Sequence, residues 1–303
     1  MSLSLAGAPV SFGVFELTPA DADTLTADEI AEILAETGYQ GIDLGPVGFL
    51  GRGASLRDRL SRHHLDLAGG WVELPLSDDD AFEIALDALN EIVQVFTDAV
   101  TDATLRLPKP TLADTGSPQR KAHPGSGAPG LDDAGWDRLV TNLNRAAERF
   151  RSAGFEPTFH HHAGTFIETP DEIERLLQST DIGLTLDTGH LLIGGGDPLT
   201  AVTRWGGRIN HVHVKDVNRA ELNRVRAAGG GMVDIWSSGA FVPLGHGDLP
   251  FAQTVDALLA CGYDGWIVVE QDVLLAPDAP LGEFREARIR DHIINRDALR
   301  SWC

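Results

Sequence analysis

The chain has 303 residues, of which 43% are hydrophobic and 23% are charged, so it holds enough apolar material for one large core. Its formal net charge of -21 repels phosphate backbones and anionic lipid headgroups, which argues against nucleic-acid and membrane partners. The two cysteines, Cys261 and Cys303, are too few for a disulfide framework or a thiolate metal site. No apolar run approaches the roughly 20 residues of a membrane span, and no signal peptide opens the chain, so we expect a cytoplasmic protein.

Short β-type runs alternate with longer helical patterns along the chain. We predict strands near 5–10, 40–44, 65–72, 101–107, 155–161, 182–187, 209–214 and 265–270. We predict helices near 27–37, 54–63, 78–97, 133–152, 170–178, 197–205, 251–261 and 281–301. Residues that favour helix N-termini precede several of these helices, as at Thr26, Thr169 and Asp197.

Eight strands and eight helices in strict alternation predict an α/β fold, a closed (β/α)₈ TIM barrel formed as a single domain over residues 1–303. An open doubly wound sheet would usually carry a glycine-rich phosphate turn after its first strand, and the sequence shows none there. Two segments interrupt the alternation, at 108–132 and 217–249. Both are typical of long surface loops. For 217–249 we favour a lid over an active site, because it follows the predicted strand with the most polar end.

Polar residues gather at the predicted carboxyl ends of strands five to eight, which share one face of a parallel barrel. Side chains alternate along a strand, and the apolar positions of these strands suit the helix-facing side. The inward positions then include His160, Asp187, His213 and Glu270. The first three are 27 and 26 residues apart, about one βα unit each, and Glu270 follows after one unit plus the long loop.

Two imidazoles and two carboxylates suit a divalent ion of borderline hardness and leave positions open for substrate oxygens. An inward histidine taken alone more often makes hydrogen bonds than binds metal, and an aspartate at a strand end commonly caps the next helix. Four such residues on four successive strands favour metal binding. We therefore predict one divalent ion held by His160, Asp187, His213 and Glu270, with Mn²⁺ or Co²⁺ preferred and Zn²⁺ or Fe²⁺ as alternatives.

The same face supplies candidates for acid–base chemistry and for substrate contacts. We predict catalytic roles for Glu270, His190 and Lys215. His190 has the alternative role of a hydrogen-bond partner to a metal ligand. The predicted substrate-binding residues are His162, Trp71, Arg106 and Glu73. Of these, Trp71 has the alternative role of packing the pocket wall, and Glu73 that of facing solvent.

Several motifs resemble those of the inosose dehydratases, within the xylose-isomerase-like TIM-barrel superfamily. They are FHHHAGT at 159–165, LDTGH at 186–190, HVHVKD at 211–216, FVPLGHGD at 241–248 and GWIVVEQD at 265–272. The match runs from about residue 135 to 275 and continues more weakly at 41–46 and 68–71. The resemblance implies a metal-dependent lyase that dehydrates a keto-polyol through a metal-stabilised enediolate and loss of a β-hydroxyl. The superfamily also holds sugar isomerases and epimerases.

Two segments depart from the family pattern. The end of strand one reads SFGVFE at 11–16, where the family tends to show a Trp followed closely by Asn or Asp. The predicted strand four is followed by RLPKP at 106–110 instead of an uncharged-to-acidic polar segment, which makes Arg106 or Lys109 a candidate for binding a carboxylate or phosphate. Sugar isomerases of the superfamily usually carry a metal-bound Glu on strand five. His160 in its place disfavours a two-glutamate isomerase and favours elimination or a one-sided proton abstraction.

Three other functions remain open. One is a metal-dependent isomerase or epimerase acting on a keto-sugar, and another is a non-catalytic sugar-binding barrel. A DNA-repair nuclease of the same superfamily is disfavoured by the acidic charge. We expect a small-molecule polyol or keto-sugar as substrate, no nucleic-acid or membrane partner, and a homo-oligomer.

Overall fold

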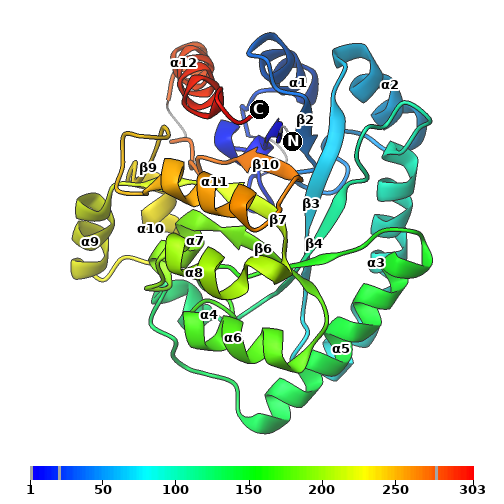
Figure 1. Cartoon of the computed structure of the whole chain (residues 1–303), viewed down its shortest axis with the longest axis vertical. Coiled ribbons are helices and arrows are strands. Elements are labelled where there is room, and N and C mark those ends of the chain that lie inside the picture. The colour runs from blue at the N-terminus through cyan, green and yellow to red at the C-terminus, as the bar shows by residue number, and fades with distance from the viewer. Residues whose placement is uncertain (1–2, 20–21, 277–278) are drawn as a thin grey trace.

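The computed structural model describes residues 3–19, 22–276 and 279–303. Eight parallel strands close into a barrel surrounded by helices, which confirms the predicted single (β/α)₈ fold (Figure 1). The barrel strands, in order around it, are β1 (Ser4–Gly7), β2 (Gly41–Asp43), β3 (Asp66–Leu74), β4 (Lys109–Asp114), β5 (Thr158–His160), β6 (Gly183–Asp187), β7 (Ile209–Val214) and β10 (Trp266–Val269). Over the described residues, none of the helices has the length and apolar character needed to span a bilayer.

Eight longer helices follow the barrel strands close to the predicted positions. They are α1 (Ala27–Glu36), α2 (Gly53–His63), α3 (Asp79–Ala99), α5 (Asp133–Ser152), α6 (Pro170–Ser179), α8 (Pro198–Trp205), α11 (Phe251–Ala260) and α12 (Leu281–Leu299). The predicted N-caps are present at Thr26, Thr169 and Asp197, where each side chain accepts a backbone N–H of the first helical turn. Local sequence signals therefore set where these helices begin.

Shorter elements connect the strands and helices. They are η1 (Pro9–Phe12), α4 (Pro118–Ala122), α7 (Thr188–Ile193), η2 (Gly206–Arg208), β8 (Asp216–Val217), α9 (Arg219–Ala227), α10 (Met232–Ser237) and β9 (Phe241–Val242). All of them except η2, which directly precedes β7, follow barrel strands. β8 and β9 pair as an antiparallel ribbon that brackets α9 and α10. The segment 217–249, predicted as a loop, is thus largely ordered into two helices on a two-stranded base.

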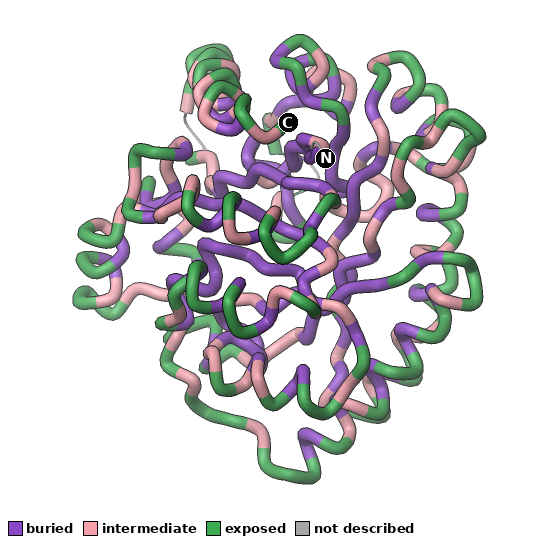
Figure 2. The backbone as a smooth tube through the Cα atoms, in the orientation of Figure 1, coloured by how far each residue is buried: buried purple, intermediate pink, exposed green. Residues whose placement is uncertain are grey.

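The hydrophobic core lies mainly between the strands and the helices, as the buried central strands and the exposed outer helix faces indicate (Figure 2). Leu184, Leu186 and Val269 belong to this layer. The inside of the barrel is different, because it holds polar side chains together with a small separate apolar cluster that includes Ala68, Trp266 and Val268. Thr158 and Thr185 hydrogen-bond there at 3.0 Å, both fully buried. Alternation along the strands therefore separates a large apolar outer layer from a mixed interior that contains the buried polar groups.

The predicted fourth strand at 101–107 is wrong, because the strand lies at β4, Lys109–Asp114. The residues before it form a loop in which Leu105 is 84% exposed. The β4 residues instead pair with both neighbours, as Thr111 does with Trp71 on β3. Prolines at 108 and 110 argued against a strand there, and the predicted loop at 108–132 in fact begins with one.

A buried ion pair holds the segment after β4 in place. The side chains of Arg120 and Glu168 are fully buried, with Nη1 of Arg120 2.8 Å from Oε1 of Glu168. The carboxylate of Glu168 also accepts the backbone N–H groups of Gly125 at 2.8 Å and Gly164 at 2.7 Å. Arg120 makes a second ion pair at 2.6 Å with Glu172, at the start of α6. These bonds tie the 115–132 segment to the end of β5.

We expect Arg120→Ala to lower the free energy of unfolding by about 3–5 kcal/mol, because it leaves the Glu168 carboxylate buried without its cation. Urea denaturation of both proteins measures the difference. Arg224→Ala is the control, since Arg224 pairs with Glu221 on the exposed surface of α9 and its removal should change the stability little. Equal losses in the two variants would contradict the prediction.

A second buried group, His292 on α12, is held neutral. Its ring stacks on Phe12 with centroids 4.7 Å apart, and its Nδ1 donates to the hydroxyl of Tyr39 at 3.0 Å. Burial lowers the pKa of His292 to about 3. The unfolded chain therefore takes up a proton near pH 6.5, where the folded protein does not.

The folded state should consequently lose stability as the pH falls from about 6.5 towards 3, by about 1.4 kcal/mol per pH unit from this group. His292→Gln removes the titration and keeps a hydrogen-bond donor for Tyr39. Urea denaturation at pH 7, 6 and 5 should show the stability difference between wild type and variant shrinking as the pH falls. A difference independent of pH would contradict the prediction.

Candidate metal centre

The four predicted metal ligands come together where β5, β6, β7 and β10 end. One ligand atom from each of His160, Asp187, His213 and Glu270 lies within 4.8 Å of the others, and all four residues are buried. Nδ1 of His213 lies 2.9 Å from Oε2 of Glu270 and 3.2 Å from Nε2 of His160. Oδ2 of Asp187 lies 3.5 Å from Nε2 of His160. Because side chains alternate between the two faces of a strand, these four side chains all point into the barrel and meet at one place.

These atoms fit a divalent ion. Ligand atoms that share one ion at 2.0–2.2 Å bonds lie about 3–3.5 Å apart, close to the separations seen here. Nδ1 of His160 donates to the carbonyl of His161 at 2.8 Å, so Nε2 presents a lone pair to the cluster. Asp187 uses Oδ1 to accept the N–H of His190 at the start of α7 and keeps Oδ2 for the cluster. Asp187 therefore caps α7 with one oxygen and still offers the other oxygen to the cluster.

Lys215, at the end of β7, brings an ammonium group to the same carboxylates. Its Nζ lies 3.0 Å from a carboxylate oxygen of Asp187, of Glu270 and of Asp272. Burial alone would lower the pKa of Lys215, but the three carboxylates outweigh it and hold the pKa above its ordinary value. In the resting site the side chain therefore carries its proton and a positive charge next to the metal-binding atoms.

His190 lies beneath Lys215 and away from the cavity. Its Nε2 accepts a hydrogen bond from Nζ of Lys215 at 2.9 Å, and its ring packs on His162 with centroids 3.5 Å apart. Burial lowers the pKa of both histidines. Nδ1 of His162 donates to the carbonyl of Ala163 at 2.8 Å, so its Nε2 can only accept a hydrogen bond. His190 thus orients Lys215, whereas His162 lines the cavity itself.

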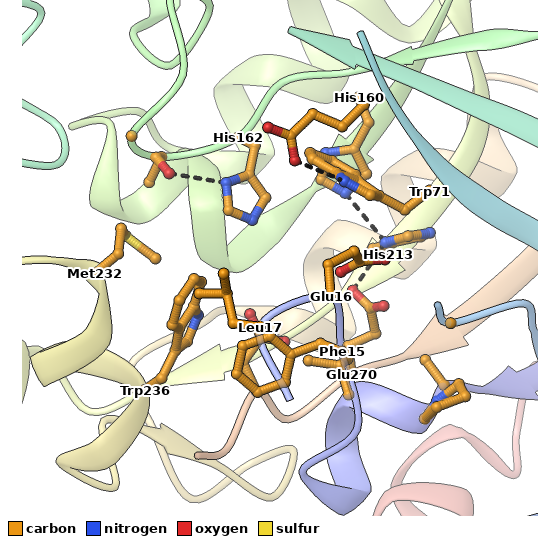
Figure 3. A pocket seen from close by; sticks show the side chains of 18 of the residues that line it. Phe15, Glu16, Leu17, Trp71, His160, His162, His213, Met232, Trp236 and Glu270 are labelled. Atoms are coloured by element: carbon orange, nitrogen blue, oxygen red, sulfur yellow. Dashed lines mark hydrogen bonds and ion pairs between the residues drawn. The ribbon is translucent and has the colours of Figure 1, made fainter. Parts of the chain in front are cut away.

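A cavity of about 230 Å³ opens above the four ligands and has two unlike sides (Figure 3). Its polar side carries His160, His213, Lys215, Glu270 and Asp272. Its apolar side is formed by Val14, Phe15, Leu17, Met232, Val233 and Trp236. The 217–249 segment therefore supplies part of the wall through α10. A pocket of this size suits a ligand the size of a single sugar.

Trp71 and Glu73, both predicted to contact substrate, lie on the cavity wall at the end of β3. The indole ring of Trp71 meets the edge of the His160 ring, with centroids 5.1 Å apart. Its Nε1 donates to Oε2 of Glu73 at 3.4 Å. The other oxygen of Glu73 lies 3.6 Å from Nζ of Lys121. Both residues are therefore placed to contact a bound ligand.

Arg106 is not placed at this cavity, which corrects the prediction made for it. It precedes β4 at the opposite end of the barrel, where its Nε donates to the hydroxyl of Ser4 at 3.0 Å. Lys109 begins the same strand and lies at that end too. The error follows from placing strand four eight residues too early along the chain. β4 ends at Asp114 and is followed by Thr115, which lines the cavity, so the departure from the family at 106–110 lies away from the cavity.

Several cavity residues were not predicted from the sequence. They are Glu16, Asp43, Thr115, Lys121 and Asp272. Asp43 and Asp272 carried a usable signal: Asp43 follows the outer-core residue Ile42, and Asp272 lies two residues after Glu270 and so shares its parity. Glu16 and Lys121 lie in connecting segments, where no periodicity applies.

A closed parallel barrel whose carboxyl rim holds two histidines and two carboxylates defines a metal-binding TIM-barrel protein. A family model described as xylose isomerase-like TIM barrel matches residues 31–288. The chain therefore belongs to the xylose isomerase-like TIM-barrel family.

Relatives within this family include several curated dehydratases. The inosose dehydratase of Lactiplantibacillus plantarum is 32% identical over 271 residues, covering 85% of each chain. Among solved structures, L-ribulose 3-epimerase superposes with a TM-score of 0.68 at 17% identity, over 99% of this chain and 94% of that one. The IOLI protein, solved with a bound zinc atom, superposes with a TM-score of 0.69 at 12% identity, over 99% of each chain. These two structures support the fold.

We expect the purified protein to bind about one divalent ion per chain, because four ligand atoms converge on a single point. Asp187→Ala and His213→Ala should each lose it, since each removes a ligand atom. Elemental analysis measures the content. Arg106→Ala is the control and should retain the ion, because Arg106 lies at the other end of the barrel. A metal content unchanged in the first two variants would overturn the assignment of the ligands.

Proposed function

We propose that this protein is a metal-dependent dehydratase acting on a keto-inositol. The observation that carries the proposal is the contact between Glu270 and Lys215, a carboxylate and an ammonium 3.0 Å apart beside the metal-binding atoms. Elimination of water needs one group to take a proton and another to give one, and this pair supplies both. The similarity to curated inosose dehydratases over most of the chain supports the choice of substrate.

We propose Mn²⁺ or Co²⁺ as the ion, with Zn²⁺ or Fe²⁺ as alternatives, because the ligands mix imidazole nitrogen with carboxylate oxygen. When bound, the ion supplies Lewis acidity, which polarises the substrate carbonyl and acidifies the neighbouring C–H. The ligands would be His160, Asp187, His213 and Glu270.

The chain's own residues then carry the protons. Glu270 accepts the proton from the carbon next to the carbonyl, and the electron pair of that C–H bond forms the new C=C bond. The C–O bond of the β-hydroxyl breaks, and Lys215 gives the departing oxygen a proton so that water leaves. Lys215 regains a proton from Glu270, its neighbour at 3.0 Å. The enol that results becomes a dione by tautomerisation.

Other residues hold the substrate in place. His190 orients the ammonium of Lys215 by accepting its hydrogen bond. His162 accepts a hydrogen bond from a substrate hydroxyl through Nε2, because its Nδ1–H is already used. Trp71 and the apolar side of the cavity exclude water from one face of the ring. These contacts favour one orientation of the polyol above the metal-binding atoms.

The charges of the cavity favour a neutral substrate. Five carboxylate residues and two lysines line it. Lys215 is engaged by three carboxylates and Lys121 lies beside Glu73, so among the described residues that line the cavity both ammonium groups already have acidic partners. A phosphate or carboxylate on the substrate would meet repulsion here. The keto-inositol is therefore proposed to bind without a phosphate group.

The second candidate is an epimerase or isomerase acting on a keto-sugar, which would share the proton abstraction but not the loss of water. The two activities separate in one assay. With keto-inositol and Mn²⁺ or Co²⁺ we expect an absorbing enone or dione, followed by ultraviolet spectroscopy and confirmed by a loss of water in mass spectrometry. An inverted or hydrogen-exchanged substrate without such a product would instead identify an epimerase. Metal binding without either change would leave a sugar-binding barrel.

Lys215→Met should lower the rate of dehydration by a factor of about 10²–10⁴, because the departing hydroxyl loses its proton donor. Exchange of the C–H hydrogen in D₂O should persist, since Glu270 remains. Nuclear magnetic resonance measures the exchange, and elemental analysis shows that the ion is retained. Lys121→Met, the same change at the cavity mouth, is the control and should affect the rate much less. Loss of exchange and dehydration in parallel, with the ion retained, would contradict the role of Lys215.

A further inference from the structure

Beneath the metal-binding atoms lies a second group of buried polar side chains, formed by Asp43, His211 and His213. One atom from each lies within 4.8 Å of the others, and all three residues are buried. Oδ2 of Asp43, both ring nitrogens of His211 and Nε2 of His213 have no hydrogen-bond partner among the described residues. Buried polar atoms without partners are rare in proteins, so this arrangement needs a physical explanation.

His213 belongs to both groups and faces them with different nitrogens. Its Nδ1 points to the metal-binding atoms, 3.2 Å from Nε2 of His160. Its Nε2 points the other way and lies 4.0 Å from Oδ2 of Asp43. Because a nitrogen that binds metal must present a lone pair, metal binding places the ring proton of neutral His213 on Nε2.

That Nε2–H then needs an acceptor, since a buried donor left without one costs about 1–3 kcal/mol. Asp43 offers a carboxylate oxygen without a partner on the same side. A shift of about 1 Å closes the gap to hydrogen-bonding distance. Gly69 leaves the approach open, because a Cβ there would crowd both groups, at 3.1 Å from Oδ2 of Asp43 and 3.0 Å from Nε2 of His211.

The backbone explains why Asp43 faces this space. The pairing of β2 with β3 shifts register between Ile42 and Asp43, which sets Asp43 opposite Gly69. Ile42 packs into the outer core, so the next side chain turns inward. A glycine opposite the carboxylate keeps the space between Asp43 and the two histidines open.

We propose that Asp43 is a positioning residue that accepts the Nε2–H of His213 and so presents Nδ1 to the ion. The inference rests on the metal centre of the proposed function and adds a residue that does not touch the ion. Hydrogen bonding from a metal-bound histidine to a carboxylate fixes the ring and raises the basicity of the ligand nitrogen. Asp43 therefore acts on metal affinity through His213.

The test is a titration of the metal-free full chain with Mn²⁺ and with Co²⁺, in wild type and three variants. Asp43→Leu keeps the volume but removes the acceptor, and it should weaken the metal Kd by about 10–100-fold. Asp43→Asn keeps an acceptor oxygen and should bind within a few-fold of wild type. Asp114→Asn is the matched control, because Asp114 is another buried carboxylate near this rim that bonds backbone N–H groups instead of a histidine.

Two further readouts separate positioning from packing. The visible spectrum of bound Co²⁺ should change in Asp43→Leu and return towards wild type in Asp43→Asn. The metal-free Asp43→Leu protein should be about as stable as wild type in urea, because it loses a buried carboxylate of which one oxygen, Oδ2, lacks a partner. A packing role would instead lower the stability and the metal affinity together.

Four results would overturn the inference. One is wild-type metal affinity in Asp43→Leu, and another is equal weakening in Asp43→Asn, which would assign the effect to charge. A third is a second ion per chain that Asp43→Leu alone removes, which would make the lower group a metal site in its own right. The last is a wild-type chain that binds no metal. The proposed function fails separately, since it is measured as dehydration and this inference as metal affinity.

Discussion

Three buried carboxylates share one ammonium group, and this imbalance of charge organises the whole polar end of the barrel. Asp187, Glu270 and Asp272 each place an oxygen 3.0 Å from Nζ of Lys215. A single cation cannot neutralise three anions in a site removed from water, where unpaired charge is costly. The same oxygens therefore favour a divalent ion, and the histidines beside them supply the remaining ligand atoms. The convergence of His160, Asp187, His213 and Glu270 on one point fits this need for a further positive charge.

The sequence allowed most of the barrel and its four converging ligands to be predicted, because both depend on local periodicity. On β6, Leu184 and Leu186 alternate with Thr185 and Asp187, and this alternation sends Asp187 inward. β10 is apolar throughout, and there the outer-core positions of Ile267 and Val269 set the parity that sends Glu270 inward. The spacing of about one βα unit then places the ligands on neighbouring strands. The fourth strand was predicted at the wrong place, because Pro108 and Pro110 are residues that rarely occur within strands. As a result, Arg106 was predicted at the wrong end of the barrel.

Contacts between segments far apart in the sequence could not be predicted from local periodicity. The hydrogen bond from Lys215 to His190 depends on the direction of α7, which Asp187 sets by capping that helix. The ion pair of Arg120 with Glu168 joins residues 48 positions apart and orders a segment whose composition suggested a flexible loop. Asp43 had the right parity, yet its role depends on a register shift that no periodicity reveals.

The two sides of the cavity come from different parts of the architecture. The polar side is built on barrel strands, whose positions are fixed by hydrogen bonds to both neighbours. The apolar side comes from the segment after β1 and from α10, which lie outside the barrel ladder. Residues such as Leu17 and Val233 can therefore change without disturbing the ligand atoms. The apolar wall can therefore vary in shape while the polar side stays fixed by the barrel strands. Related proteins of this architecture could then differ in the substrates they accept without moving the ligand atoms.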